Sequence, residues 1–187
     1  MRKVFIDCGA HNGCSVRKFR KLYDPERNYE FHSFEPNSTT ALDFNEPGVN
    51  FYQKAVTATG KVVPFFVHSI DDFACTTYRK KGILPNCGSP RAGNTLLQEV
   101  ESVRLSKFIK DNFSPDDHIV LKLDIEGEEY NVIPDLFETG AIELVNELYL
   151  EWHSHWMNES NEVDKELEEK IKNKGIILIN DWDASDC

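Results

Sequence analysis

The first residues that could do chemistry form a short loop between an apolar run, residues 4–6, and an amphipathic segment. The loop begins with Asp7 and contains Gly9 and Gly13. Glycines at these positions let the backbone approach a ligand closely at the start of a helix. Asp7 adds a carboxylate that suits a cationic group rather than a phosphate. The loop therefore predicts a ligand site, and the alternative is a tight strand-to-helix turn without a ligand.

A second acidic residue, Glu35, ends the next apolar run and is followed by Pro36. It lies 22 residues after Gly13, near the spacing at which an acidic side chain bonds ribose hydroxyls in nucleotide-binding sheets. Pro36 removes one backbone donor and helps to end a strand. An acidic residue at a strand end is common by itself. Together with the first loop, it predicts a nucleoside-binding site.

A third group of polar residues follows two later apolar runs. Asp124 and Glu126 come after residues 119–123, and His153 comes after residues 148–150. Ligands of open α/β sheets bind at the carboxyl ends of the strands, so we expect these side chains to meet there. Carboxylates and imidazole can accept a proton during catalysis. The alternative for Asp124 is to cap the following helix, and Lys122 is expected to pair with a neighbouring carboxylate.

The elements that would position these residues alternate regularly along the chain. Short apolar runs predict buried strands at residues 4–6, 31–34, 49–52, 119–123, 148–150 and 176–179. Amphipathic spacing predicts helices at residues 15–22, 38–44, 130–137 and 162–174, the first with a solvated basic face and the second capped by Ser38. This order predicts a doubly wound α/β fold, with a mostly parallel sheet covered by helices on both faces.

The segment from residue 61 to residue 101 interrupts this alternation. It opens with an apolar strand at residues 62–67 and then becomes irregular, with several glycines and prolines. A loop of this length in a compact domain is usually functional. Residues 69–100 are therefore predicted to form an insertion or lid on the substrate side. Because no linker divides the 187 residues, we expect a single domain over residues 1–187.

Composition excludes several classes of function. The chain carries 21 Lys and Arg against 32 Asp and Glu, a net charge of −11, which disfavours binding to nucleic acid or anionic lipid. No apolar run approaches the roughly 20 residues of a membrane span. Five scattered cysteines without a Cys-x-x-Cys pair count against a disulfide framework and a thiolate zinc site. They favour a reducing compartment, and a cytoplasmic location is predicted.

Three motifs, in this order, resemble the FkbM family: Asp-x-Gly-Ala-x-x-Gly at residues 7–13, Phe-Glu-Pro-Asn at 34–37 and Lys-x-Asp-x-Glu-Gly-x-Glu at 122–129. The resemblance covers about residues 4–153. It implies an S-adenosylmethionine-dependent methyltransferase with the class I Rossmann-like fold, and many members act on sugar hydroxyls. Such sheets usually end in an antiparallel strand pair, whereas in this sequence residues 176–179 are the last segment clearly predicted to be a strand. Six strands are therefore expected, or seven if residues 62–67 join the sheet.

The resemblance also assigns cofactor-binding residues, in three groups. The first loop and the start of its helix would hold the methionine portion, through Asp7, Gly9, Ala10, Asn12, Gly13 and Ser15. Around the second motif, Glu35 would bind the ribose hydroxyls, with Phe34, Pro36 and Asn37 beside the adenosine. Ala55 and Val56, expected to end the third strand, would lie near the adenine. His11 departs from the family pattern, because a small or polar residue often stands there.

The implied reaction is transfer of a methyl group to a hydroxyl of a sugar or glycan by in-line displacement. Alignment of the reacting atoms can supply about 7–11 kcal/mol. One of Asp124, Glu126 and His153 would act as the general base, worth about 10²–10⁴-fold. The alternatives are a non-sugar acceptor, namely a lipid, a protein or a small metabolite, and a non-catalytic module that binds the cofactor.

Three further patterns have two readings each. Asp124, Glu151, His153 and His155 offer ligands for a divalent metal ion, but no strict spacing supports one and no metal is predicted. The basic run at residues 79–81 could contact an anionic acceptor or be a plain exposed loop. Trp152 and Trp156 could stack on a sugar ring, with packing as the alternative.

Overall fold

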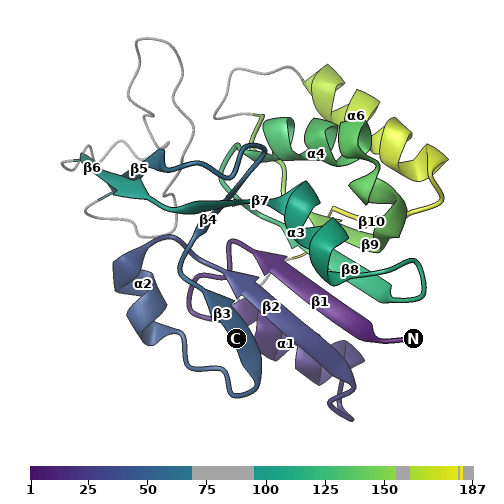
Figure 1. Cartoon of the computed structure of the whole chain (residues 1–187), viewed down its shortest axis with the longest axis horizontal. Helices are drawn as coiled ribbons and strands as arrows, with labels where there is room; N and C mark the ends of the chain where they lie inside the picture. The colour runs from purple at the N-terminus through teal and green to yellow at the C-terminus, as the bar shows by residue number, and fades with distance from the viewer. Residues whose placement is uncertain (69–94, 155–160, 181, 183–187) are drawn as a thin grey trace.

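The computed structural model describes residues 1–68, 95–154, 161–180 and 182. Its centre is a six-stranded sheet in the order β10-β9-β8-β1-β2-β3 (Figure 1), and every neighbouring pair is parallel. The strands are β1 (Lys3–Cys8), β2 (Tyr29–Phe34), β3 (Val49–Tyr52), β8 (His118–Leu123), β9 (Val145–Leu150) and β10 (Ile177–Ile179). The chain first adds strands on one side of β1 and then on the other. This confirms the predicted doubly wound, Rossmann-like sheet with six strands.

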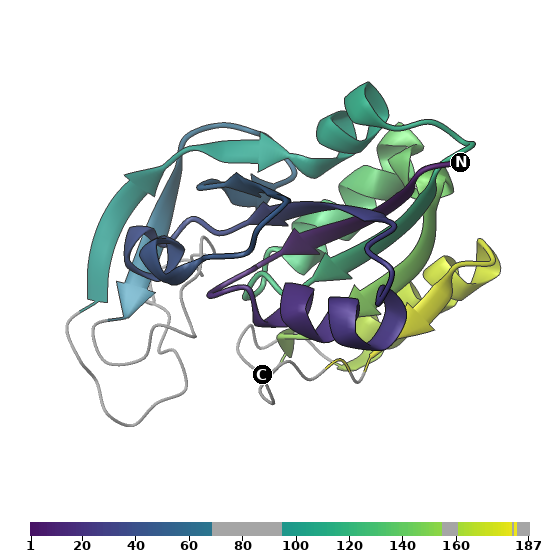
Figure 2. The same ribbon diagram turned by 90° about the horizontal axis from the view of Figure 1, so that it is seen from below.

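Helices cover both faces of the sheet, as Figure 2 shows. One face carries α1 (Cys14–Tyr23), and the other carries α3 (Leu105–Asn112), α4 (Glu129–Thr139) and α6 (Asn161–Asn173). A short 3₁₀ turn, η1 (Ala141–Leu144), follows α4 and leads into β9. Gly140, in the left-handed conformation with φ 75°, ends α4.

Alternating side chains of the strands build two separate cores. In β1, Phe5 points toward α1, whereas Val4 and Ile6 pack with α3 and α4. The core under α1 is aromatic: the Phe5 and Phe19 rings stack with centroids 4.2 Å apart, and Phe31 meets them edge-on. Both faces of the central strands are therefore apolar, as expected for a parallel sheet buried on both sides.

The prediction that α1 has a fully solvated basic face is wrong at Arg20. This side chain is 10% exposed and lies 3.0 Å from Glu46 Oε2, and it also donates to the carbonyl of Pro47. Its guanidinium also lies over the Phe31 ring, with Cζ 4.6 Å from the ring centroid. A long side chain of this kind can bury its carbons while its charged end finds an anionic partner.

The cap of the second helix also differs from the prediction. Helix α2 (Ser38–Asp43) begins at Ser38, but its N-cap is Asn37, whose side chain accepts a hydrogen bond from the backbone of Thr39. Asparagine and serine are both favourable N-cap residues, so the sequence alone did not separate them.

The third strand ends at Tyr52, so the prediction that residues 54–56 complete it is wrong. A separate strand β4 (Ala55–Thr57) pairs in parallel with β7 (Ser102–Arg104) outside the main sheet. The apolar strand predicted at residues 62–67 is β5 (Val63–His68). It pairs antiparallel with β6 (Thr95–Val100), so it adds no seventh strand to the sheet.

The predicted lid at residues 69–100 is described only at its end. Residues 69–94 lie outside the described part of the chain. Residues 95–100, expected to be irregular, form strand β6 instead. Both views show the β5–β6 pair at one end of the molecule, beyond α2 (Figures 1 and 2).

Two findings bear on the environment of the chain. Within the described residues, no helix has the length and apolar character needed to span a membrane. Cys8 is a buried free thiol, whereas Cys14 is disulfide-bonded, a bond that the sequence analysis did not predict. The cytoplasmic location stays a prediction.

Replacing Phe19 by Ala tests the aromatic core beneath α1. Phe19 is 1% exposed, so Phe19→Ala is expected to lower the free energy of unfolding by about 3–5 kcal/mol, measured by urea denaturation. Leu22→Ala in the same helix is the control, because Leu22 is 52% exposed and should cost less than about 0.5 kcal/mol. Equal losses in the two variants would contradict this packing.

Candidate functional site

The candidate site lies where the strand order reverses, at the carboxyl ends of β1 and β8. These strands are neighbours, with Asp7 opposite Lys122. The Lys122 ammonium lies 3.1 Å from Asp7 Oδ1 and 3.1 Å from Asp124 Oδ2, and it donates to the carbonyl of Gly9 at 2.9 Å. Lys122 thus pairs with carboxylates, as the sequence analysis expected. The cationic partner of Asp7 in this structure is Lys122.

The charges of this group stabilise one another. Burial works against the charged form of Lys122, but the carboxylates of Asp124 and Asp7 outweigh it, and the pKa of Lys122 is raised above its ordinary value. Lys122 therefore stays an ammonium at neutral pH and cannot serve as a base. A buried charge is tolerated when it is paired in this way.

The first loop, residues 9–13, turns sharply and is tied to the neighbouring strand. Gly9 has φ 86°, and a side chain there would collide with the carbonyl oxygen of Asp124. The backbone amides of Gly9 and Ala10 both donate to the carbonyl of Phe34, at 3.0 and 2.9 Å. Gly13, with φ 88°, begins α1. The loop therefore lies between the ends of β8 and β2, and Gly9 is required by both the conformation and the space.

Glu35 is buried directly beside this loop. Its carboxylate accepts hydrogen bonds from the backbone amides of His11, at 3.0 Å, and Asn37, at 2.8 Å. Burial raises the pKa of Glu35 to about 7, and the two amide hydrogen bonds offset part of that effect. His11 has φ 46°, which turns its amide toward Glu35. The backbone amide of His11, a residue that the sequence did not explain, is thus one of the two that bind Glu35.

The other residues assigned to the cofactor divide between the loop and the core. Asn12 Oδ1 accepts from the backbone of Cys14, and Ser15 accepts from the indole of Trp182 at 3.3 Å. Phe34 and Val56 are buried in the larger core, and Ala55 is 2% exposed. Because Ala55 and Val56 belong to β4, their expected place near an adenine stays a prediction.

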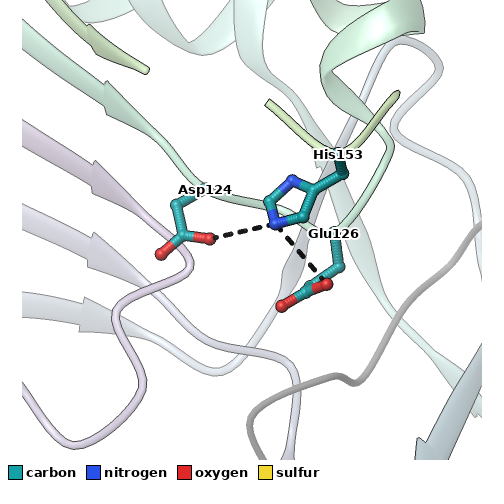
Figure 3. Close-up of side chains that lie close together, drawn as sticks. All are labelled: Asp124, Glu126 and His153. Atoms are coloured by element: carbon teal, nitrogen blue, oxygen red, sulfur yellow. Dashed lines mark ion pairs between the residues drawn. The ribbon is translucent and has the colours of Figure 1, made fainter. Parts of the chain in front are cut away.

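Asp124, Glu126 and His153 converge at the ends of β8 and β9 (Figure 3). His153 Nε2 lies 3.8 Å from Asp124 Oδ1 and 3.6 Å from Glu126 Oε2. A further carboxylate, Glu151, lies 3.9 Å from the same nitrogen. His153 is buried, whereas the side chains of Asp124 and Glu126 are 29% and 21% exposed. The expected meeting of these residues is found, and Asp124 does not cap α4, which has no side-chain cap.

The sequence analysis missed Glu129, which organises this cluster. Its fully buried carboxylate accepts hydrogen bonds from the backbone amides of Ile125 and Gly127, at 2.6 and 2.8 Å. The same carboxylate lies 3.1 Å from Nδ1 of His153. Glu126, held between these two amides, has φ 54°. The signal in the sequence was the final glutamate of the third motif.

Burial and neighbouring carboxylates both shift the pKa values of this cluster. For His153 the two effects oppose each other, and for Glu126 they act in the same direction. Burial would lower the pKa of His153, but the hydrogen bond and charge of Glu129, with the nearby carboxylates, raise it to about 9. Burial raises the pKa of Glu126 to about 8; His153 opposes this shift and nearby carboxylates, Asp124 first, add to it. Burial also raises the pKa of Glu151. The cluster can therefore hold and exchange protons near neutral pH.

Several predicted contacts cannot be placed here. His155, Trp156 and residues 79–81 lie outside the described residues. Trp152 packs against the ring of Tyr130 and donates from its indole to Glu168. This fits the packing alternative for Trp152.

Comparison with known proteins agrees with this arrangement. A family model for the FkbM methyltransferase domain matches residues 7–178. The chain belongs to the FkbM methyltransferase family. The match includes all three motifs and supports a methyltransferase activity. No curated protein and no solved structure gave a significant match.

Glu35 gives this FkbM domain a testable pH dependence. Its pKa is raised from about 4.5 to about 7 in the folded chain, so the folded state holds the proton more tightly. Its contribution to stability is complete below pH 4.5 and is lost as the pH rises to about 7. Relative to Glu35→Gln, the wild type is expected to lose about 3 kcal/mol across this range, measured by urea unfolding. If the free energies of unfolding of the two proteins changed in parallel with pH, this prediction would be contradicted.

Proposed function

We propose that this FkbM domain transfers a methyl group from S-adenosylmethionine to a hydroxyl of a sugar or glycan. The observation that carries the proposal is the convergence of Asp124, Glu126 and His153 beside the first loop and Glu35, at the point where the strand order reverses. Ligands of open α/β sheets bind at this place. Family membership supports the methyl transfer; the cofactor and the acceptor are the proposed part.

The charge and the backbone conformation of the site suit the cofactor. When bound, S-adenosylmethionine supplies an activated methyl group on a positively charged sulfur. The site offers carboxylates in excess of its paired ammonium, Lys122, which suits a cationic ligand. The loop of residues 9–13 would hold the methionine portion through its backbone, where Gly9 and Gly13 have positive φ. Glu35, at the end of β2, would accept hydrogen bonds from the ribose hydroxyls.

The cluster at the ends of β8 and β9 would orient the acceptor and take its proton. Carboxylate oxygens of Asp124 and Glu126 are partly exposed and can accept hydrogen bonds from hydroxyl groups. His153 Nε2 faces the same position from the buried side. A hydroxyl held there would pass its proton to the cluster as the methyl group is transferred in line. A site rich in hydrogen-bond acceptors supports a polyhydroxylated acceptor over an apolar one.

Cofactor binding is tested first. The wild type is expected to bind S-adenosylmethionine in calorimetry, and Glu35→Gln to bind about 10- to 100-fold more weakly, because hydrogen bonds to a charged group are worth about 1.5–3 kcal/mol. Glu26→Gln is the matched control, an exposed residue before β2 with the same change of charge. Absence of binding by the folded wild type would refute the cofactor, and equal affinity of Glu35→Gln would refute its place at the ribose.

The chemical step is tested with single variants. A screen of sugars and glycans first identifies an acceptor by the formation of S-adenosylhomocysteine. Asp124→Asn, Glu126→Gln and His153→Gln are then measured in single turnover, and the variant lacking the base should lose about 10²–10⁴-fold in rate. Retained cofactor affinity shows that each variant is folded. Unchanged rates in all three variants would rule out a general base among these residues. Turnover on non-sugar acceptors alone would refute the proposal of a sugar acceptor.

A further inference from the structure

Three donor atoms converge within 4.8 Å of one another at the ends of β8 and β9. They are Nε2 of His153 and one carboxylate oxygen each of Asp124 and Glu126 (Figure 3). We propose that these atoms bind one divalent metal ion of the kind that accepts mixed oxygen and nitrogen ligands, such as Mn²⁺. Carboxylates suit Mg²⁺ and Mn²⁺, and imidazole suits the later transition metals, so the set favours an ion between them.

The distances suit a shared ion better than direct hydrogen bonds. His153 Nε2 lies 3.8 Å from Asp124 Oδ1 and 3.6 Å from Glu126 Oε2, beyond hydrogen-bond length. Neighbouring donors around an ion bound at about 2.1 Å are roughly 3.0–3.4 Å apart. Because the three donor atoms lie within 4.8 Å of one another, the side chains would move closer together on binding the ion.

Once His153 has lost its proton, the local charge also suits a cation. Asp124 shares its Oδ2 with the Lys122 ammonium and directs Oδ1 toward His153. Glu126 adds a second carboxylate, and Glu151 brings a third to 3.9 Å from the same nitrogen. An ion at the centre would offset repulsion among these carboxylates, and Glu151 lies within reach as a further ligand.

Glu129 supplies an independent observation, because it is not one of the three ligands. Its fully buried carboxylate lies 3.1 Å from Nδ1 of His153. Histidines that bind metals almost always donate their second ring N–H to a carboxylate or carbonyl, which fixes the ring and directs the other nitrogen at the ion. Glu129 holds His153 in this orientation, with Nε2 facing Asp124 and Glu126.

The site is closed on one side and open on the other. The side chain of His153 is 4% exposed, whereas those of Asp124 and Glu126 are 29% and 21% exposed. Water or an acceptor hydroxyl can therefore reach the remaining coordination positions. If the proposed methyl transfer holds, the ion would position the acceptor oxygen and lower the pKa of its hydroxyl.

Titration of the intact, chelator-treated chain with Mn²⁺ tests the site, with calorimetry and electron paramagnetic resonance as readouts. Coordination requires the imidazole to lose its proton, so the titration is run at mildly alkaline pH. One ion per chain is expected, with a dissociation constant on the order of 10⁻⁴ M or tighter. Asp124→Asn and Glu126→Gln should each weaken binding at least about tenfold. Glu129→Gln should weaken it about 10- to 100-fold.

Glu128→Gln is the matched control, because it removes the same charge from the same loop; its carboxylate accepts from Asn131. It should keep the wild-type affinity for Mn²⁺. Lack of saturable binding by the folded wild type, or equal binding by Asp124→Asn and Glu126→Gln, would overturn the metal site. Full methyl transfer in excess chelator would also overturn it while leaving the proposed function standing. Mn²⁺ binding without binding of S-adenosylmethionine would leave the metal site and refute the proposed function.

Discussion

The buried ion pair between Asp7 and Lys122 is the contact on which the geometry of the site depends. The Lys122 side chain is 4% exposed, so its ammonium needs anionic partners, and it finds them in Asp7 on β1 and in Asp124 just after β8. The same ammonium binds the carbonyl of Gly9. One charge thus fixes the ends of β1 and β8, the first loop and one oxygen of Asp124. Removing either carboxylate would leave the ammonium poorly compensated.

A second buried carboxylate, that of Glu129, fixes the part of the site formed by Glu126 and His153, as the Asp7–Lys122 pair fixes the part beside the first loop. It draws in the amides of Ile125 and Gly127 and so shapes the turn that presents Glu126. It also holds His153, which comes from the segment after β9. Charges inside the fold therefore set the positions of the partly exposed carboxylates of Asp124 and Glu126.

Much of this arrangement follows from local features of the sequence, and the exceptions depend on distant partners. The central strands were predictable because both of their faces are apolar, and the meeting of Asp124 with His153 follows from the rule for strand ends. The separation of β4 from β3 was not, because only Gln53 and Lys54 stand between Tyr52 and Ala55. The burial of Arg20 was not predictable either, because it depends on Glu46, which lies 26 positions away in the sequence. Glu129 reads as an ordinary first-turn residue of a helix, since spacing alone does not show that its carboxylate turns inward.

The central pairing joins β1, at the start of the chain, to β8, more than a hundred residues later. Contacts between such distant segments form slowly, because a long loop must close before they are rewarded. During synthesis the first strand, its loop and Glu35 emerge long before Lys122 exists to balance Asp7. Until β8 has been synthesised, one edge of β1 has no partner strand and Asp7 has no ion pair with Lys122. The site can therefore form only after β8 has been made, because Lys122 lies near its end and Asp124 directly follows it.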